Sequence, residues 1–291
     1  MSRYDVLYIL IIKSLEAIPY KGLFYIGKVL ALLLHTLPNK HKKISKANLE
    51  LVFPHKTSLQ INTILRDSLF HSIMNILEVG LVWGKQDYKK KPGFINVKNF
   101  SQIETALSSN KGVLLFTPHI GNIEIIINFL GQHTDCTIPY TQPKNKDLDK
   151  IITNSRNKSG VKMVDINVSG IKEMLSALKN KKLVAIASDQ VPKKGAGIIS
   201  KFFNSEIYSM SLLPKLQQRS GCVAHLMYCE RKENGKGFVI HFDSKIDLSS
   251  NIQDGVDKMN NEFEKCIMKL PEQYSWEYKK FKRTELDSIY L

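Results

Sequence analysis

The chain has 291 residues, of which 43% are hydrophobic, enough for a sizeable buried core in one large domain or two small ones. This composition excludes a globally disordered chain. Forty-two Lys and Arg against 27 Asp and Glu give a net charge of +15, which favours acidic partners such as anionic lipid, an acidic protein or nucleic acid without choosing among them.

Two apolar segments, Val6 to Ile12 and Leu23 to Leu34, lie in the first 37 residues on either side of Pro19. Neither reaches the roughly 18 uncharged apolar residues that a membrane-spanning helix needs. We therefore expect residues 1–37 to form two amphipathic or partly embedded helices at a membrane surface, with Tyr4, Tyr8, Tyr20 and Tyr25 at the interface. The alternative is a pair of core helices packed on the rest of the domain.

Lysine-rich clusters follow these helices, at residues 41–46, 89–91, 179–182, 193–194 and 279–283. Each cluster alone is typical of solvated surface. Apolar helices followed by lysines indicate the cytoplasmic face of a membrane, and together the clusters could recruit lipid phosphates or an acidic carrier protein.

Residues 38–291 alternate between helix-like and strand-like patterns, which predicts one α/β domain. The predicted helices lie at residues 59–82, 103–107, 171–179 and 254–270, and the predicted strands at 113–117, 183–188, 222–229 and 238–242. The turn-rich segment 234–237 joins the last two strands, so part of the sheet should be an antiparallel hairpin.

His119 and Glu124 follow the strand predicted at residues 113–117. On an unbroken helix, side chains five residues apart point roughly 140° away from each other, so the pair can meet only if the helix is interrupted. Pro118 ends the strand, Gly121 permits a turn, and Asn122 is a good N-cap for a helix that begins at Ile123. Glu124 in the first helical turn could then reach back to the imidazole.

A histidine oriented by a carboxylate can accept a proton near neutral pH, which suggests activation of a hydroxyl group. The alternative is a capping arrangement or a surface ion pair. Asp189 and Gln190 follow the strand predicted at residues 183–188, and site residues gather at strand ends in α/β sheets, so the two strand ends could share a cleft. Asp189 could instead cap a loop, and Arg156 could be an ordinary surface arginine.

Several other chemistries lack their usual motifs. Cys136, Cys222, Cys229 and Cys266 have neither zinc-ligand nor disulfide-framework spacing, so we expect reduced thiols. The chain also has no H-E-x-x-H, no Walker A loop, no G-x-G-x-x-G and no G-x-S-x-G elbow. We therefore expect no metal and no cofactor.

Read together, the H-x4-E pair, Arg156, Asp189-Gln190-Val-Pro192, Phe202-Phe203 and the ending Pro271 to Arg283 resemble the lipid A biosynthesis late acyltransferases. The similarity extends from about Lys42 to Arg283. It implies a glycerolipid acyltransferase-like fold, with a single mixed β-sheet flanked by helices. It also implies an enzyme at the cytoplasmic face of the cell inner membrane that transfers a fatty acyl chain from acyl carrier protein to a hydroxyl of a lipid A precursor.

The resemblance also implies residue roles. His119 would be the general base and Glu124 would orient it. Arg156 would contact either the oxyanion or a lipid phosphate, with backbone N–H groups of Gly121 and Asn122 as possible further donors. Asp189 and Gln190 would organise the site.

The chain departs from the family pattern at three positions. The family usually has aromatic residues where Ile120 and Ile123 stand, and glycine where Asn204 follows Phe202-Phe203. We expect these changes to affect the apolar part of the site rather than proton transfer. Three other functions stay open: acyl transfer to a glycerolipid, a membrane scaffold without activity, and a basic protein that binds nucleic acid, although nucleic-acid-binding motifs are missing.

Overall fold

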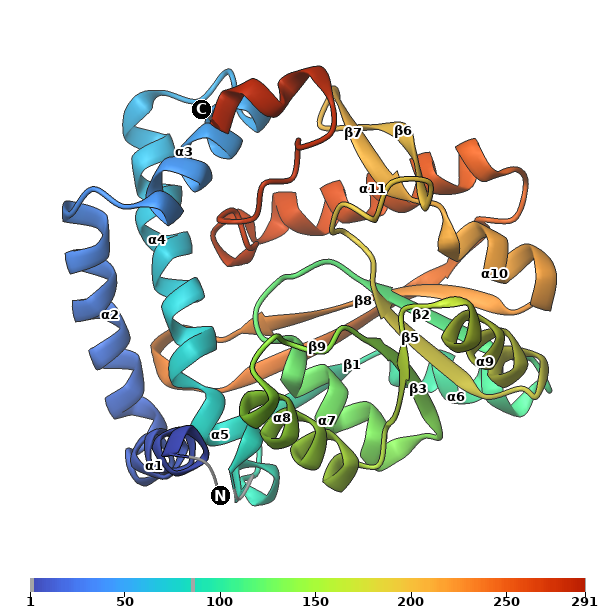
Figure 1. Cartoon of the computed structure of the whole chain (residues 1–291), viewed down its shortest axis with the longest axis horizontal. Coiled ribbons are helices and arrows are strands. Elements are labelled where there is room, and N and C mark those ends of the chain that lie inside the picture. Colours follow the sequence, from blue (N-terminus) through green and yellow to red (C-terminus); the bar gives the residue numbers. More distant parts are fainter. Residues whose placement is uncertain (1–2, 85–86, 291) are drawn as a thin grey trace.

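The computed structural model describes residues 3–84 and 87–290, which form one main sheet covered by helices on both faces (Figure 1). The helices are α1 (Arg3–Ala17), α2 (Tyr20–Thr36), α3 (Lys40–Val52), α4 (Ser58–Leu77), α5 (Val79–Trp83), α6 (Phe100–Ser108), α7 (Ile123–His133), α8 (Lys146–Ser159), α9 (Val168–Lys179), α10 (Leu212–Ser220) and α11 (Ile252–Lys269), with 3-10 turns η1 (Asp87–Lys90), η2 (Glu233–Gly235), η3 (Pro271–Gln273) and η4 (Glu285–Tyr290). The strands are β1 (Ile95–Lys98), β2 (Val113–Thr117), β3 (Cys136–Tyr140), β4 (Lys162–Asp165), β5 (Leu183–Ala187), β6 (Gly197–Phe202), β7 (Ser205–Met210), β8 (Val223–Arg231) and β9 (Phe238–Ile246).

The main sheet has the strand order β1-β9-β8-β2-β5-β3-β4. Only β8 and β9 pair antiparallel, and the other neighbours are parallel, so the sheet is mixed. The predicted α/β fold with a mixed sheet and a hairpin between β8 and β9 is confirmed. The hairpin of β6 and β7 forms a separate two-stranded sheet, which the prediction of a single sheet omitted.

Strand β2 shows why the sheet is covered on both faces. All five of its residues are buried, and successive side chains point to opposite sides. Leu114 and Phe116 pack in one apolar cluster with residues of α3, α4, α9, α10 and α11. Val113 and Leu115 pack in the other, with residues of α2, α6 and α7. The strand therefore holds its carboxyl end rigidly between two packed layers.

Helix α2 has two different faces. Leu23, Phe24 and Ala31 are buried, whereas Tyr25 and Val29 are exposed. The buried face packs beside α4, at one end of the molecule (Figure 1). Tyr20, expected at the membrane interface, is buried instead. The inner face thus belongs to the core, as the alternative reading of these helices expected.

Membrane association of these helices and a division at residue 37 remain predictions. Among the described residues, no single helix is long and apolar enough to cross a membrane. The pair Leu7–Ala17 and Tyr20–Thr36, which is bent by 111°, meets that criterion of length and composition together.

Candidate active site

The turn between β2 and α7 places His119 at the carboxyl edge of the sheet. Gly121 has a φ of 60°, and a Cβ atom there would come within 2.1 Å of the carbonyl oxygen of Cys229. Glycine is therefore required by both conformation and space. Asn122 caps α7, because its side-chain oxygen accepts a hydrogen bond from the backbone N–H of Glu124 at 2.9 Å. The predicted turn and N-cap are confirmed.

Asp189 is the hydrogen-bond partner of His119. Its Oδ1 lies 2.6 Å from His119 Nδ1, and its Oδ2 accepts the backbone N–H of His119 at 3.0 Å. The sheet register explains the contact, since Thr117 of β2 is opposite Ala187 of β5, and the residues two positions beyond each strand meet. We expected Glu124 to orient the imidazole, and the structure gives that contact to Asp189.

The two side chains shift each other's pKa. Burial opposes protonation of His119, but the Asp189 carboxylate outweighs burial, so the pKa of His119 is raised above its usual value. Burial likewise opposes ionisation of Asp189, and His119 overcomes it, so the pKa of Asp189 falls to about 2. With Nδ1–H donated to an ionised carboxylate, Nε2 keeps its lone pair and can accept a proton. Nε2 lies 3.4 Å from Nε2 of Gln190.

Glu124 forms an ion pair with Arg156. Arg156 Nη2 lies 2.5 Å from Glu124 Oε1, and Nε lies 3.3 Å from Oε2, so the contact is bidentate. The guanidinium also stacks over the ring of Tyr140 at 5.0 Å. Glu124 thus orients Arg156 rather than His119. This ion pair joins α7 to α8, and the spacing of the two residues along the chain gives no sign of it.

The two backbone N–H groups considered as oxyanion donors differ in their partners. The N–H of Gly121 donates to the carbonyl oxygen of Gln273 at 3.0 Å. Burial raises the pKa of Cys229 to about 12, and a hydrogen bond from the backbone of Asn122 to its sulfur acts in the opposite direction. The N–H of Gly121 therefore fixes the turn and does not face a reacting carbonyl, whereas the role of the Asn122 N–H as an oxyanion donor stays a prediction.

His119, Glu124 and Arg156 line one cavity of about 390 Å³. Its walls are otherwise mostly apolar and include Ile123, Ile126, Ile127, Leu130, Ile138 and Met227. A larger cavity of about 750 Å³ shares Tyr140, Ile166, Gln190 and Met210 with it. The imidazole therefore faces a continuous space in which an apolar chain can approach a proton acceptor and a cation.

Comparison with known proteins decides the family. The family model described as bacterial lipid A biosynthesis acyltransferase matches residues 1–283. This chain belongs to the bacterial lipid A biosynthesis acyltransferases. It is 23% identical to the lipid A biosynthesis palmitoleoyltransferase of Escherichia coli (strain K12), over 94% of this chain and 90% of that protein.

Two further relatives have the same breadth of match. The lipid A biosynthesis lauroyltransferase of Escherichia coli (strain K12) is 25% identical over 91% of this chain and 87% of that protein. A lipid A biosynthesis acyltransferase of Haemophilus influenzae is 26% identical over 93% of this chain and 87% of that protein. Each of these sequence matches therefore covers most of both chains.

The departures from the family pattern can now be placed. Ile123 lines the cavity, whereas Ile120 is fully buried and forms a bridge with Tyr274. Asn204 has a φ of 62°, in the left-handed region that glycine adopts readily and asparagine tolerates. Phe202 and Phe203 pack against the core and line neither cavity, which corrects the expectation that the change at Asn204, directly after them, affects the apolar part of the site.

The C-terminal segment of the acyltransferase adds contacts that residue patterns had not assigned. The ammonium group of Lys280 is buried and donates to the carbonyl oxygen of Asp189. Burial lowers the pKa of Lys280 to about 8, and Asp189 acts in the opposite direction. Ser275 N–H donates to the carbonyl oxygen of His119 at 3.1 Å. In the sequence, the family-like ending at residues 271–283 was the only indication of these contacts. This segment holds the ends of β2 and β5 through its hydrogen bonds to His119 and Asp189.

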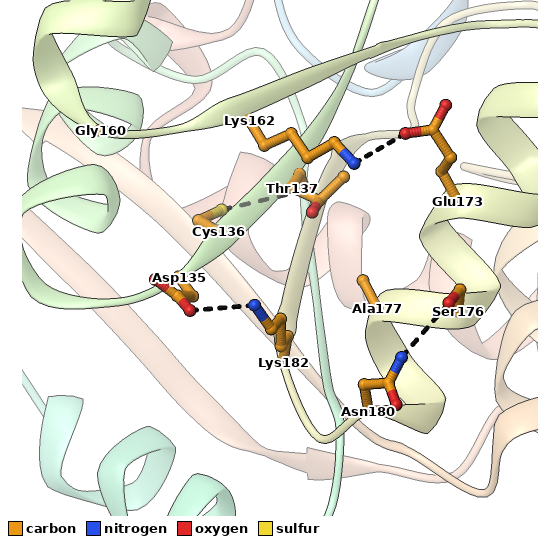
Figure 2. A pocket seen from close by; sticks show the side chains of 10 residues that line it. All are labelled: Asp135, Cys136, Thr137, Gly160, Lys162, Glu173, Ser176, Ala177, Asn180 and Lys182. Atoms are coloured by element: carbon orange, nitrogen blue, oxygen red, sulfur yellow. Dashed lines mark hydrogen bonds and ion pairs between the residues drawn. The ribbon is translucent and has the colours of Figure 1, made fainter.

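A third pocket, drawn in Figure 2, lies at the opposite edge of the sheet, where β3, β4 and β5 begin. Lys182 and Asp135 precede β5 and β3, and these residues pair at 3.1 Å. Lys162, the first residue of β4, pairs with Glu173 at 2.8 Å. The charges in this pocket already neutralise each other, and His119 lies at the other end of the strands, so this pocket is separate from the candidate active site.

Proposed function

We propose that this acyltransferase transfers a fatty acyl chain from acyl carrier protein to a hydroxyl group of a lipid A precursor. Family membership supports acyl transfer in lipid A biosynthesis. The observation that carries the proposal is the His119–Asp189 pair, in which Nδ1 contacts the carboxylate and His119 lines a mostly apolar cavity that shares lining residues with a second one.

In the proposed step, His119 Nε2 accepts the proton of the acceptor hydroxyl as its oxygen attacks the thioester carbonyl carbon. Asp189 holds the Nδ1–H tautomer and stabilises the imidazolium. When the tetrahedral intermediate collapses, the C–S bond breaks and the leaving thiol takes the proton from Nε2. His119 and Asp189 return to their starting state, and no covalent enzyme intermediate is needed.

Arg156 is the proposed cation for the developing oxyanion or for a phosphate of the acceptor. Its contact with Glu124 uses Nε and one side of the guanidinium, and its other N–H groups are left for a ligand. Removing one such donor from a site that excludes water costs about 3 to 4 kcal/mol of transition-state stabilisation. Glu124 would thus support catalysis by holding Arg156 in the cavity.

The proposed location is the cytoplasmic face of the inner membrane. The exposed apolar face of α2 supports contact with a lipid surface, and the net charge of +15 supports attraction to anionic lipid and to an acidic carrier protein. Both substrates would then reach one site, the acceptor from the membrane and the acyl chain from solution.

Mass spectrometry of lipid A tests the proposal. Lipid A from the host should gain one acyl chain when the wild-type protein is present, and should lack it in a deletion strain complemented with His119→Ala. The mass difference gives the acyl-chain length. Unchanged lipid A, or full complementation by folded His119→Ala, would reject the proposal, and acylation of a glycerolipid instead would identify a different acceptor.

A further inference from the structure

A fully buried carboxylate lies where the helix predicted at residues 59–82 breaks into α4 and α5. Glu78 occupies the break, and its side chain has no solvent exposure. Its Oε1 accepts from Tyr20 Oη and from Arg231 Nε, each at 2.7 Å. Its Oε2 accepts from Arg231 Nη2 and from Asn122 Nδ2, also at 2.7 Å. One carboxylate therefore joins α2, strand β8 and the turn that carries His119.

Stability alone does not explain this ion pair. Two buried charges lose their hydration, and replacing such a pair by apolar residues is often neutral or stabilising. Arg231 requires further acceptors, His71 Nδ1 at 2.6 Å and Asn75 Oδ1 at 2.7 Å. Burial and the neighbouring Arg231 lower the pKa of His71, which keeps the ring neutral and able to accept. A network with so many directed contacts fixes positions more effectively than it adds stability.

The network reaches the catalytic turn by two routes. The first is the direct bond from Asn122 to Glu78. The second runs through Arg231, whose backbone N–H donates to Gln273 Oε1 at 2.7 Å and whose carbonyl accepts from Gln273 Nε2 at 3.0 Å. The carbonyl of Gln273 then accepts the N–H of Gly121. Both routes end on consecutive residues of the turn, Gly121 and Asn122, directly after His119 and Ile120.

We infer that Glu78 is a positioning residue that couples the seating of α2 to the geometry of the turn carrying His119. Tyr20 contributes the α2 end of this coupling, and Asn122 contributes the turn end. Tyr25 and Val29 on the outer face of the same helix are exposed. A lipid surface that binds this face would therefore also influence the position of Tyr20 and its hydrogen bond to Glu78. This inference rests on the proposed function only in assigning catalysis to His119, which lies in that turn.

Two conservative substitutions test the coupling. Asn122→Ser keeps a side-chain oxygen for the N-cap of α7 and removes the donor to Glu78. Tyr20→Phe removes one hydroxyl from α2. The matched control is Asn251→Ser, because Asn251 also caps a helix, α11, and also donates Nδ2 to a carboxylate, that of Asp254 at 2.6 Å, at an exposed position away from the cavity.

Hydrogen exchange measured by mass spectrometry on the full chain gives a readout that needs no substrate. Amides in residues 118–126 should exchange at least about tenfold faster in Asn122→Ser and in Tyr20→Phe, the effect of losing one hydrogen bond to a charged group. Exchange in β3 and β5 should stay at the wild-type rate, and Asn251→Ser should match the wild type in residues 118–126. With acyl carrier protein and lipid A precursor, kcat should fall while KM is unchanged, because the turn positions His119 for proton transfer rather than for substrate binding.

Unchanged exchange at residues 118–126 in both variants would overturn the inference. An increase spread evenly over the sheet would also overturn it, because that pattern indicates loss of global stability. If Asn122→Ser does not fold, Tyr20→Phe alone decides. A wild-type protein without lipid A acylation would reject the proposed function, and the exchange result would still answer whether Glu78 couples α2 to the turn.

Discussion

The protonation of His119 sets the pH dependence that we expect for the reaction. A general base must be neutral, so the rate rises as His119 loses its proton. Because Asp189 raises the pKa of His119, the half-maximal kcat/KM of the wild type should lie above pH 6.5, the usual value for histidine. In Asp189→Asn the carboxylate is lost and burial remains, so the midpoint should move to lower pH and the maximal rate should fall by about 100-fold or more.

The matched control for Asp189→Asn is Asp135→Asn. Asp135 also pairs with a basic side chain, that of Lys182, but it lies on the surface at the opposite edge of the sheet (Figure 2). Its pH profile should match the wild type. An Asp189→Asn enzyme with the wild-type midpoint would show that Asp189 does not control the imidazole.

Glu124 and Arg156 should behave as one unit in mutant kinetics. Glu124→Gln removes the charge that holds the guanidinium, and Arg156→Lys removes the bidentate contact, so each should lower kcat by about 100-fold, or ~3 kcal/mol. The double variant should lose little more than either single variant. The pH midpoint of Glu124→Gln should remain that of the wild type. A shift like that of Asp189→Asn would instead assign Glu124 to His119.

Sequence patterns located these residues better than they paired them. His119 and Asp189 were each placed after a buried strand, and the shared strand edge was predicted. Their hydrogen bond depends on the β2–β5 register, a contact between residues 70 positions apart, whereas Glu124 is near His119 in the chain. Glu78 lay inside the helix predicted at residues 59–82, and its charge there was the only signal of a buried pair, whereas Arg231 lay two residues beyond the strand predicted at 222–229 and carried no such signal.

Helix α2 makes a prediction at the scale of one element. Its outer face exposes Tyr25, Val29 and Leu33, which are four residues apart and therefore on one side of the helix. Val29→Glu should weaken binding to vesicles of phosphatidylethanolamine and phosphatidylglycerol by about tenfold or more, because a buried Val contributes about 1.5 kcal/mol and a charge must be kept hydrated. Co-sedimentation with the vesicles measures this.

The control places the same charge at another exposed valine. Val168, the first residue of α9, is 72% exposed, against 61% for Val29. Val168→Glu should bind vesicles like the wild type, and both variants should keep the wild-type melting temperature. If Val29→Glu binds vesicles as well as the wild type does, the prediction that α2 contacts the membrane is wrong.

Element prediction succeeded where the pattern was long and failed where strands were short or polar. The helix at 254–270 and the strands at 113–117 and 183–188 were found within two residues of their ends, because apolar periodicity is strong there. Strand β3 contains Pro139, which disfavours a strand, and β1 is mostly exposed. Parallel pairing across the sheet stabilises both strands despite their weak local signals.

Charge distribution is the property of the whole molecule that bears on the acyl donor. The larger cavity beside the active site is bordered by the exposed basic side chains Lys193, Lys215 and Arg219. An acidic carrier protein that docks there would bring its acyl chain to the space shared by both cavities. Attraction between exposed charges is screened over about 10 Å at 0.1 M salt, so docking of this kind must depend on ionic strength.

We therefore expect KM for acyl carrier protein to rise with NaCl concentration while kcat stays nearly constant. Lys215→Glu and Arg219→Glu together should raise KM at low salt by about tenfold or more and should flatten its salt dependence, since the attraction that salt screens is already lost. Lys111→Glu is the control, because Lys111 is exposed two residues before β2, at the edge of the sheet opposite His119. Steady-state kinetics at several NaCl concentrations measures KM for acyl carrier protein in each variant. If the control raises KM as much as the charge reversal beside the cavity, net charge alone attracts the donor, and a KM independent of salt would exclude electrostatic docking.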